Sequence, residues 1–182
     1  MHSDGKRQKV ILTALFTALS VVLGYLMAAV PNVELMTISV FISGMFTGPR
    51  WGALTGVLSI TVFSLFNPYG AALPPLLAAQ AAGFSLAGAC GGILRGVIKR
   101  RGMLAAALSG LFITFIYDIL TTLASAYVVL GPDGFAGGLA GFFWASAIFI
   151  MIHTGVNTLV FSQAATAVTR ISYFDDAYKG IS

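Results

Sequence analysis

The sequence predicts an all-α integral membrane protein with six transmembrane helices and both termini in the cytoplasm. Three observations predict this fold class. Hydrophobic residues make up 58% of the 182-residue chain and charged residues only 9%, whereas a soluble domain carries about 25% charged residues. The apolar residues fall into six runs. All ten Lys and Arg residues lie at the ends of these runs or between them, on one side, which the positive-inside rule assigns to the cytoplasm.

Prolines delimit the six apolar runs, because a proline inside a helix removes a hydrogen bond and kinks the chain. Lipid requires each run to satisfy its own backbone hydrogen bonds, as a helix does. We therefore predict a single membrane domain, residues 1–182, with helices over residues 10–30, 33–47, 51–66, 75–98, 103–130 and 139–168. The second and third runs are short for a full crossing, which needs about 20 residues.

The first run follows a polar and basic opening, MHSDGKRQK, as the apolar part of a secretory signal would. Its length suits a membrane span, and no convincing cleavage site precedes PNVEL, so we expect a retained helix. Ala14 and Ala18 lie four residues apart on one face of this helix, near its cytoplasmic end. Such spacing of small residues lets another helix approach closely.

The stretch AVPNVELM, between the first two helices, holds one of only six acidic residues in the chain. Pro31 ends the first helix. Asn32 is then placed to cap the second helix, with Glu34 in its first turn, where a carboxylate interacts favourably with the helix dipole. In the alternative interpretation, Asn32 and Glu34 belong to a lid over a bound small molecule. Both interpretations stay open at this point.

The next outer loop and the fourth helix carry a second group of polar residues. Asn67 and Tyr69 lie in NPYG, and Gln80 follows about a turn and a half into the helix. Alternatively, Asn67 only forms a turn, and Tyr69 is an aromatic residue at the membrane interface. Further along, the small-residue run AGACGG favours packing between helices of this chain. Its Cys90 is the single cysteine, so we interpret it as a small packing residue that forms no internal disulfide.

The fifth and sixth helices carry the ionisable groups at membrane depth, which are costly there and are functional candidates by default. Asp118 lies about 22 Å along its helix from the cytoplasmic end, in the outer half. His153 is near the middle of the last helix, and Asn157 follows four residues later on the same face. Alternatively, the Asp118 carboxylate is satisfied by Tyr117, Thr121 or a neighbouring helix. His153 and Asn157 would form a polar clamp between helices.

These polar groups come from two loops and three helices but all lie in or near the predicted outer half. Small-molecule sites combine apolar walls with a few placed polar groups. The predicted substrate-binding residues are Asn32, Glu34, Asn67, Tyr69, Gln80, Asp118, His153 and Asn157. We expect no metal site, because these residues lack zinc-ligand spacing, and no cofactor. The sequence contains no phosphate-binding GxxxxGK[ST] and no HExxH, so we expect no enzyme activity and no ATP hydrolysis by this chain. The net charge of +4 reflects membrane topology, not nucleic-acid binding.

The AxxxA of the first helix and the series PNVEL, GPRWGAL and NPYG resemble the S components of energy-coupling factor (ECF) vitamin transporters of prokaryotic cell membranes. The resemblance extends over essentially the whole chain. It implies a subunit that captures a vitamin-like micronutrient from outside, with the loops closing over the predicted substrate-binding residues. It also implies docking through Ala14 and Ala18 onto a membrane coupling subunit that two cytoplasmic ATPases drive. The identity of the substrate does not follow.

Two other functions remain open on the residues themselves. In the first, the chain is an autonomous small transporter in which Asp118 and His153 relay protons. In the second, it is a non-transporting scaffold subunit of a membrane enzyme. Against the first stands the absence of an obvious inverted repeat or a proline-broken helix, which secondary transporters typically contain.

Overall fold

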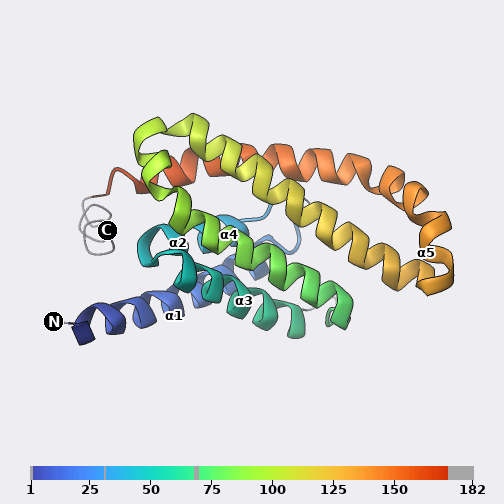
Figure 1. The fold of residues 1–182 in the computed structure, drawn as a ribbon, viewed down its shortest axis with the longest axis horizontal. Helices are drawn as coiled ribbons and strands as arrows, with labels where there is room; N and C mark the ends of the chain where they lie inside the picture. Colours follow the sequence, from blue (N-terminus) through green and yellow to red (C-terminus); the bar gives the residue numbers. More distant parts are fainter. Residues whose placement is uncertain (1, 31, 68–69, 172–182) are drawn as a thin grey trace.

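The computed structural model describes residues 2–30, 32–67 and 70–171, which form a bundle of helices packed lengthwise (Figure 1). Its elements are α1 (His2–Met27), α2 (Met36–Thr47), α3 (Pro49–Leu65), α4 (Pro74–Arg101) and α5 (Met103–Val168). By length and composition, α1 from Gly5, α4 and α5 are apolar enough to cross a membrane, and α2 is a shorter apolar helix. The chain is thus an α-helical, multi-pass membrane protein.

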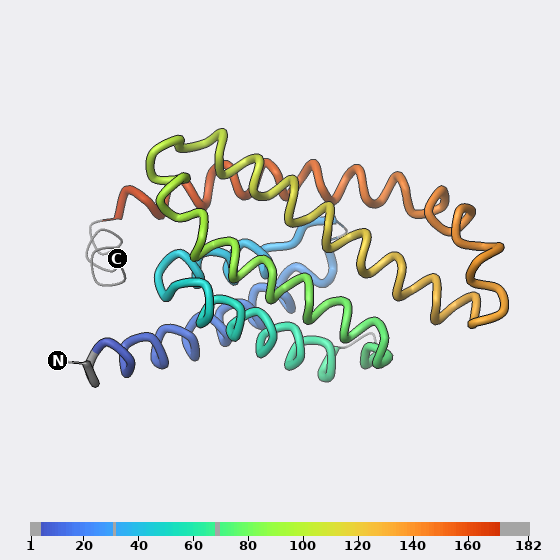
Figure 2. The backbone as a smooth tube through the Cα atoms, viewed as in Figure 1, coloured from blue at the N-terminus to red at the C-terminus, as the bar shows by residue number. Residues whose placement is uncertain are grey.

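The last element, α5, is a hairpin whose two arms run side by side in opposite directions (Figure 2). Its backbone reverses at Gly131, which adopts φ 69° and ψ 171°, a region that glycine enters without steric cost. Pro132 follows directly, and its fixed φ suits the first turn of a helix. The helix therefore resumes well before residue 139, so the predicted loop before residue 139 is wrong. The count of six membrane crossings and the cytoplasmic termini stay predictions.

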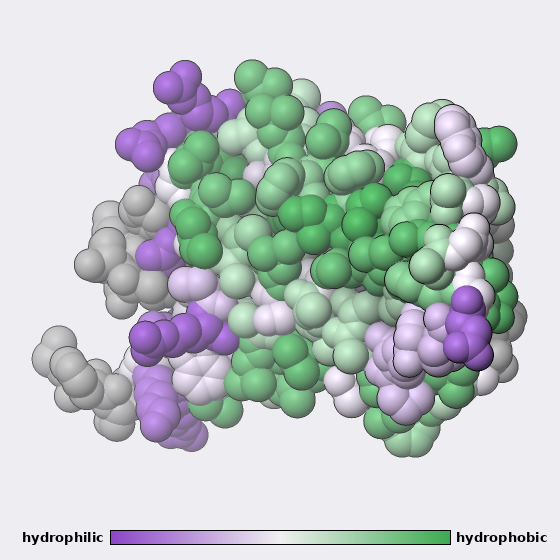
Figure 3. Space-filling model, turned by 45° about the vertical axis from the view of Figure 1, so that its right-hand side comes forward, coloured by the Kyte–Doolittle hydropathy of each residue, from purple (hydrophilic) through white to green (hydrophobic). Residues whose placement is uncertain are grey.

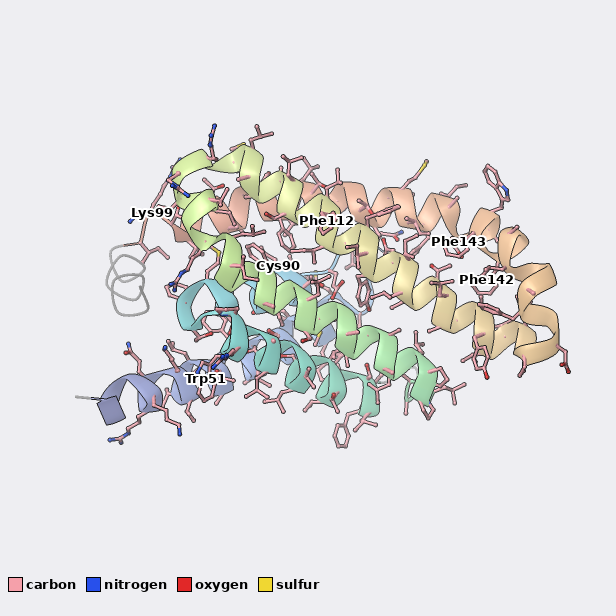
Figure 4. The ribbon with its side chains drawn as sticks, viewed as in Figure 1. Trp51, Cys90, Lys99, Phe112, Phe142 and Phe143 are labelled. Carbon is pink, nitrogen blue, oxygen red and sulfur yellow. The ribbon has the colours of Figure 1, made fainter. Side chains whose placement is uncertain are left out.

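The basic residues gather at one end of the bundle. The beginning of α1, the α2–α3 turn, the α4–α5 turn and the end of α5 all lie there, as does Lys99 (Figures 1 and 4). A broad hydrophobic band separates this end from a smaller hydrophilic group at the other end (Figure 3). At the basic end, α1 continues through the opening residues to His2, so the predicted start at residue 10 is too late. Lys, Arg and Gln, which dominate that segment, are good helix formers.

The core is centred on α2, in which every residue except Ile42 is buried. A helix that is apolar on all sides belongs in an interior. The Phe41 ring of α2 contacts the Phe161 ring of α5, with ring centroids 5.1 Å apart. At 12 residues, α2 is about 18 Å long, shorter than the roughly 30 Å of bilayer hydrocarbon. It therefore acts as a core element. Residues 28–35 precede it, and the turn at Gly48 joins it to α3.

Glycines bring the backbones of α2, α3 and α4 into direct contact. A Cβ atom built on Gly44 or Gly52 would overlap the carbonyl oxygen of Gly88, and one on Gly88 would overlap the carbonyl oxygen of Gly52. We call this arrangement the glycine contact. The small-residue run of α4 thus packs within the chain, as predicted, and Cys90 of that run is a partly buried neighbour of the core.

Candidate functional site

The segment 28–35 carries two predicted site residues toward the α5 hairpin. Asn32 has φ 60°, a left-handed conformation that asparagine adopts more readily than most residues. The N-cap of α2 is Leu35, which makes no side-chain capping bond, and the first turn holds no acidic residue. The predicted helix-capping roles of Asn32 and Glu34 are therefore wrong. Because the helix begins only at Met36, both side chains are free to face the interior.

Asp118 and His153 join the two arms of α5. The carboxylate Oδ1 of Asp118 lies 2.7 Å from Nδ1 of His153, and the Thr154 hydroxyl donates to Oδ2 of Asp118 at 3.3 Å. Asp118 is 2% exposed and His153 is 4% exposed. Removing one partner of a buried pair leaves the other uncompensated, which is strongly destabilising. The second arm thus engages both Asp118 oxygens. This arrangement is the carboxylate satisfied by a neighbouring helix that the sequence allowed as an alternative.

The other ring nitrogen of His153 connects the hairpin to segment 28–35. Its Nε2 lies 3.0 Å from Nδ2 of Asn157 and 3.4 Å from Oε2 of Glu34. A neutral imidazole that donates from Nδ1 to Asp118 accepts at Nε2 from Asn157; a protonated one donates from Nε2. Within the described ranges, no three His, Cys, Asp or Glu residues are arranged to hold a metal ion. The distances show that His153 contacts Asp118, Asn157 and Glu34 directly.

A cavity of about 330 Å³, which we call the histidine cavity, opens beside these residues. It is lined by Asn32, Val33, Glu34, Gln80, Tyr117, Asp118, Thr121, Phe149 and His153. Phe149 packs on His153 with ring centroids 5.5 Å apart, and Tyr117 meets Phe84 edge-on at 5.5 Å. Gly83 makes room for the Tyr117 ring, because a Cβ there would lie 2.6 Å from Tyr117 Cδ2. The cavity thus combines aromatic walls with clustered polar groups, as ligand sites do.

A second cavity, of about 350 Å³, adjoins the first at Gln80, which lines both. Its other lining residues are Ser64, Asn67, Gly70, Ala71, Ala72, Leu73, Leu76, Ser125, Val128 and Val129. The Ser64 hydroxyl donates to Oε1 of Gln80 at 2.8 Å and so links α3 to α4. The Gln80 side chain is therefore held by α3 at the boundary between the two cavities.

The structure brings most of the predicted substrate-binding residues together. Five line the histidine cavity: Asn32, Glu34, Gln80, Asp118 and His153. Asn157 is fully buried beside His153, Asn67 lines the second cavity, and Tyr69 lies outside the described residues. Contact of each with a ligand stays a prediction.

Sequence reasoning did not assign four residues of the histidine cavity to the site: Val33, Tyr117, Thr121 and Phe149. Spacing within α5 could have found two of them. Phe149 precedes His153 by four residues and Thr121 follows Asp118 by three, so each shares a helix face with a predicted site residue.

An apolar groove of about 640 Å³ lies between α1 and α3, apart from the two cavities. We call it the α1–α3 groove. It is lined by Val10, Thr13, Ala14, Thr17, Ala18, Val21, Val22, Trp51, Leu54, Leu58 and Val62. Ala14 and Ala18 are both exposed, and Trp51 marks the basic end of α3 (Figure 4). The groove therefore places both predicted docking residues on an accessible apolar surface.

One comparison with known proteins bears on this arrangement. The family described as "ECF transporter, substrate-specific component" matches residues 8–169, which is most of the chain. No curated protein and no solved structure gives a significant match. The matched residues include the whole histidine cavity and the whole α1–α3 groove.

Proposed function

Because this chain belongs to the family of ECF transporter substrate-specific components, we propose that it is the substrate-capture subunit of an ECF-type ABC importer in a prokaryotic plasma membrane. In this proposal it binds a vitamin or related micronutrient from outside. It then delivers the molecule through a membrane coupling subunit that two cytoplasmic ATPases power. The chain itself catalyses no reaction.

The histidine cavity is the observation that carries the proposal. Segment 28–35, α4 and both arms of α5 each contribute a polar side chain to it, namely Glu34, Gln80, Asp118 and His153. Its volume of about 330 Å³ lies within the range of known small-molecule sites, roughly 300–1,000 Å³. Four separate segments of the chain therefore contribute to one cavity.

The charge distribution supports the proposed direction of capture. In this proposal the basic end of the bundle is the cytoplasmic end, as the positive-inside rule favours. Asp118 lies fifteen residues after Met103, which begins α5 at that end, and is therefore about 22 Å away along the helix. The histidine cavity then lies in the half of the bundle that faces outward, where a nutrient arrives.

The α1–α3 groove supports the proposed docking. Ala14 and Ala18 leave the space that the groove occupies, and their spacing allows close helix approach. The occupant in this proposal is a helix of the coupling subunit. Because lipid tails are as apolar as the groove, docking depends on shape and close packing and not on hydrophobicity alone.

A cavity-filling pair of variants tests ligand capture. Thr121 and Thr158 both donate a hydroxyl hydrogen bond to the carbonyl four residues earlier, but only Thr121 lines the histidine cavity. The ligand that co-purifies with the protein is identified by mass spectrometry and its binding is measured by titration. We expect Thr121→Phe to weaken binding more than tenfold and Thr158→Phe to change it less than twofold.

Three results would contradict the proposal. Unchanged ligand binding in Thr121→Phe would place the ligand elsewhere. Solute-coupled proton flux in proteoliposomes that contain this chain without ATPases would instead support the autonomous transporter, and complete absence of ligand binding would support the scaffold.

A further inference from the structure

The histidine cavity is rich in hydrogen-bond acceptors and contains no strong base. Its lining includes the carboxylates of Glu34 and Asp118, and none of the Lys or Arg residues that the structure describes. The cavity is therefore lined by two acidic side chains and by one basic side chain, that of His153. The charge of the cavity therefore discriminates between ligands of opposite sign.

The two carboxylates are not equally free. Asp118 is 2% exposed, and its oxygens are held by His153 and Thr154. The Glu34 side chain keeps 22% of its surface exposed, and only its Oε2 is directed at His153, at the longer distance of 3.4 Å. Asp118 thus positions His153, while Glu34 presents an acceptor edge to the cavity.

Asn32, which also lines the cavity, carries an acceptor that no described residue satisfies. Its Oδ1 is buried and has no hydrogen-bond partner among the described residues, although the residue lines the cavity. A buried carbonyl without a donor costs free energy, which a ligand N–H or O–H group would recover. Asn32 and Glu34 are two positions apart on one segment, so a ligand with two neighbouring donors can engage both.

The aromatic side chains of the histidine cavity further restrict the class of ligand. Tyr117 and Phe149 both line the cavity, and both pack against the His153 ring, with centroids 6.4 Å and 5.5 Å away. Aromatic faces attract cations and stack on flat rings. A carboxylate or phosphate would instead face two carboxylates, and the one imidazole present, that of His153, is already engaged by Asp118.

We propose that the histidine cavity selects a flat, neutral or cationic molecule with at least two N–H or O–H donors, and rejects ligands that carry a carboxylate or phosphate there. The donors bond Glu34 and Asn32, and the ring packs beside Tyr117 and Phe149. This inference rests on the proposed function and adds to it the chemical class of the substrate.

Three planar probes of nearly equal shape test the charge selection: benzamidinium, benzamide and benzoate, which are cationic, neutral and anionic. Each is titrated against the purified full-length protein, and the rise in thermal-unfolding temperature is measured. We expect the order of apparent affinity to be benzamidinium, then benzamide, then benzoate. Benzoate binding equal to or tighter than benzamidinium binding would overturn the assigned class.

Substitutions of Glu34 and Asn32 test whether these two acceptors cause the charge selection. Losing a charge-assisted hydrogen bond weakens binding on the order of tenfold to a hundredfold, which we expect for benzamidinium with Glu34→Gln. Asn32→Gly keeps the left-handed backbone accessible and removes the amide, so it should also weaken benzamidinium binding. Asp133→Asn is the matched control, since Asp133 is an exposed carboxylate that does not line the cavity. Equal effects of Glu34→Gln and Asp133→Asn would contradict the inference.

Mass spectrometry of the co-purifying molecule separates this inference from the proposed function. A molecule without carboxylate or phosphate groups supports both. A carboxylate or phosphate ligand that Thr121→Phe displaces overturns the substrate class alone. No co-purifying molecule, together with no stabilisation by any of the three probes, contradicts both.

Discussion

The glycine contact and the α1–α3 groove both depend on small residues, but with opposite structural results. In the glycine contact, the missing side chains of Gly44, Gly52 and Gly88 let three helix backbones touch within the chain. In the groove, Ala14 and Ala18 are exposed and leave a space of about 640 Å³ beside α3. One sequence pattern therefore builds a closed interior contact in one region and an open surface in the other.

The difference lies in what surrounds each small residue. Gly88, Gly91 and Gly92 of α4 face α2 and α3, and α2 is buried almost throughout, so no space remains beside them. The alanines of α1 are flanked by exposed residues, among them Leu15 and Leu19 at 61% and 47% exposure. Small-xxx-small spacing thus indicates close approach, but the surrounding residues decide whether the partner belongs to the same chain.

The largest expected effect comes from breaking the glycine contact with Gly88→Ala. A methyl group at Gly88 would overlap backbone atoms of Gly52 and Ala53, and backbone cannot yield as a flexible side chain does. We expect a loss of about 3 kcal/mol or more in unfolding free energy, at the upper end of overpacking costs. Thermal unfolding in detergent, with the yield of monodisperse protein, measures it.

Gly155→Ala is the control for that change. A Cβ on Gly155 would meet no described atom within 4 Å, and alanine is a better helix former than glycine by about 0.5–1 kcal/mol. We therefore expect equal or slightly higher stability. If Gly88→Ala were tolerated as well as Gly155→Ala, the glycine contact would not be as close as described.

The next effect is on transport and not on folding. Ala14→Trp fills the α1–α3 groove with an indole without disturbing the interior, because Ala14 is exposed. Uptake in cells that supply the coupling subunit and ATPases should fall more than tenfold, whereas ligand affinity of the purified protein should stay within twofold. Ala145→Trp, at an exposed alanine of α5 outside the groove, should change neither. Uptake at the wild-type rate in Ala14→Trp would remove the groove from the docking proposal.

Local patterns predicted those features of this molecule that depend on neighbours along one helix. The helical membrane class follows from composition, and the shared face of Ala14 and Ala18 follows from their spacing. His153 and Asn157 also share a face, as predicted, and their side chains are hydrogen-bonded. In each case 3.6 residues per turn fix the geometry before any tertiary contact forms.

Features that depend on contacts between distant segments were not predictable in the same way. Glu34 was assigned either to the first turn of α2 or to a lid at the mouth, and its direct contact with His153, more than a hundred residues along the chain, was not predicted. Asn32 fits the preferences of a helix cap, but its left-handed backbone places it in a turn before the helix. Glycine-rich residues 131–138 carry the composition of a loop, yet all but Gly131 are helical. Tertiary packing overrides local preference at all three positions.

The smallest expected effect compares one substitution, threonine to valine, in the two regions. Beside the glycine contact, the Thr55 hydroxyl lies 2.8 Å from the Ser43 hydroxyl, and both are buried. Thr55→Val removes that partner and should cost about 1–2 kcal/mol of unfolding free energy. In the groove, the Thr17 hydroxyl is buried without a hydrogen-bond partner among the described residues. Thr17→Val therefore removes an unsatisfied group, and we expect a gain of up to about 1 kcal/mol.

Uptake measured with Thr17→Val then shows how the groove is recognised. Unchanged uptake, with the stability gain, is the expected outcome, because a groove recognised by shape does not depend on a hydroxyl of nearly the same volume. A severalfold loss of uptake at unchanged ligand affinity would instead show that the hydroxyl bonds a group of the docked partner. The partner would then recognise the α1–α3 groove through a polar pair, like the pair that Ser43 and Thr55 form beside the glycine contact. Recognition by shape alone would be wrong.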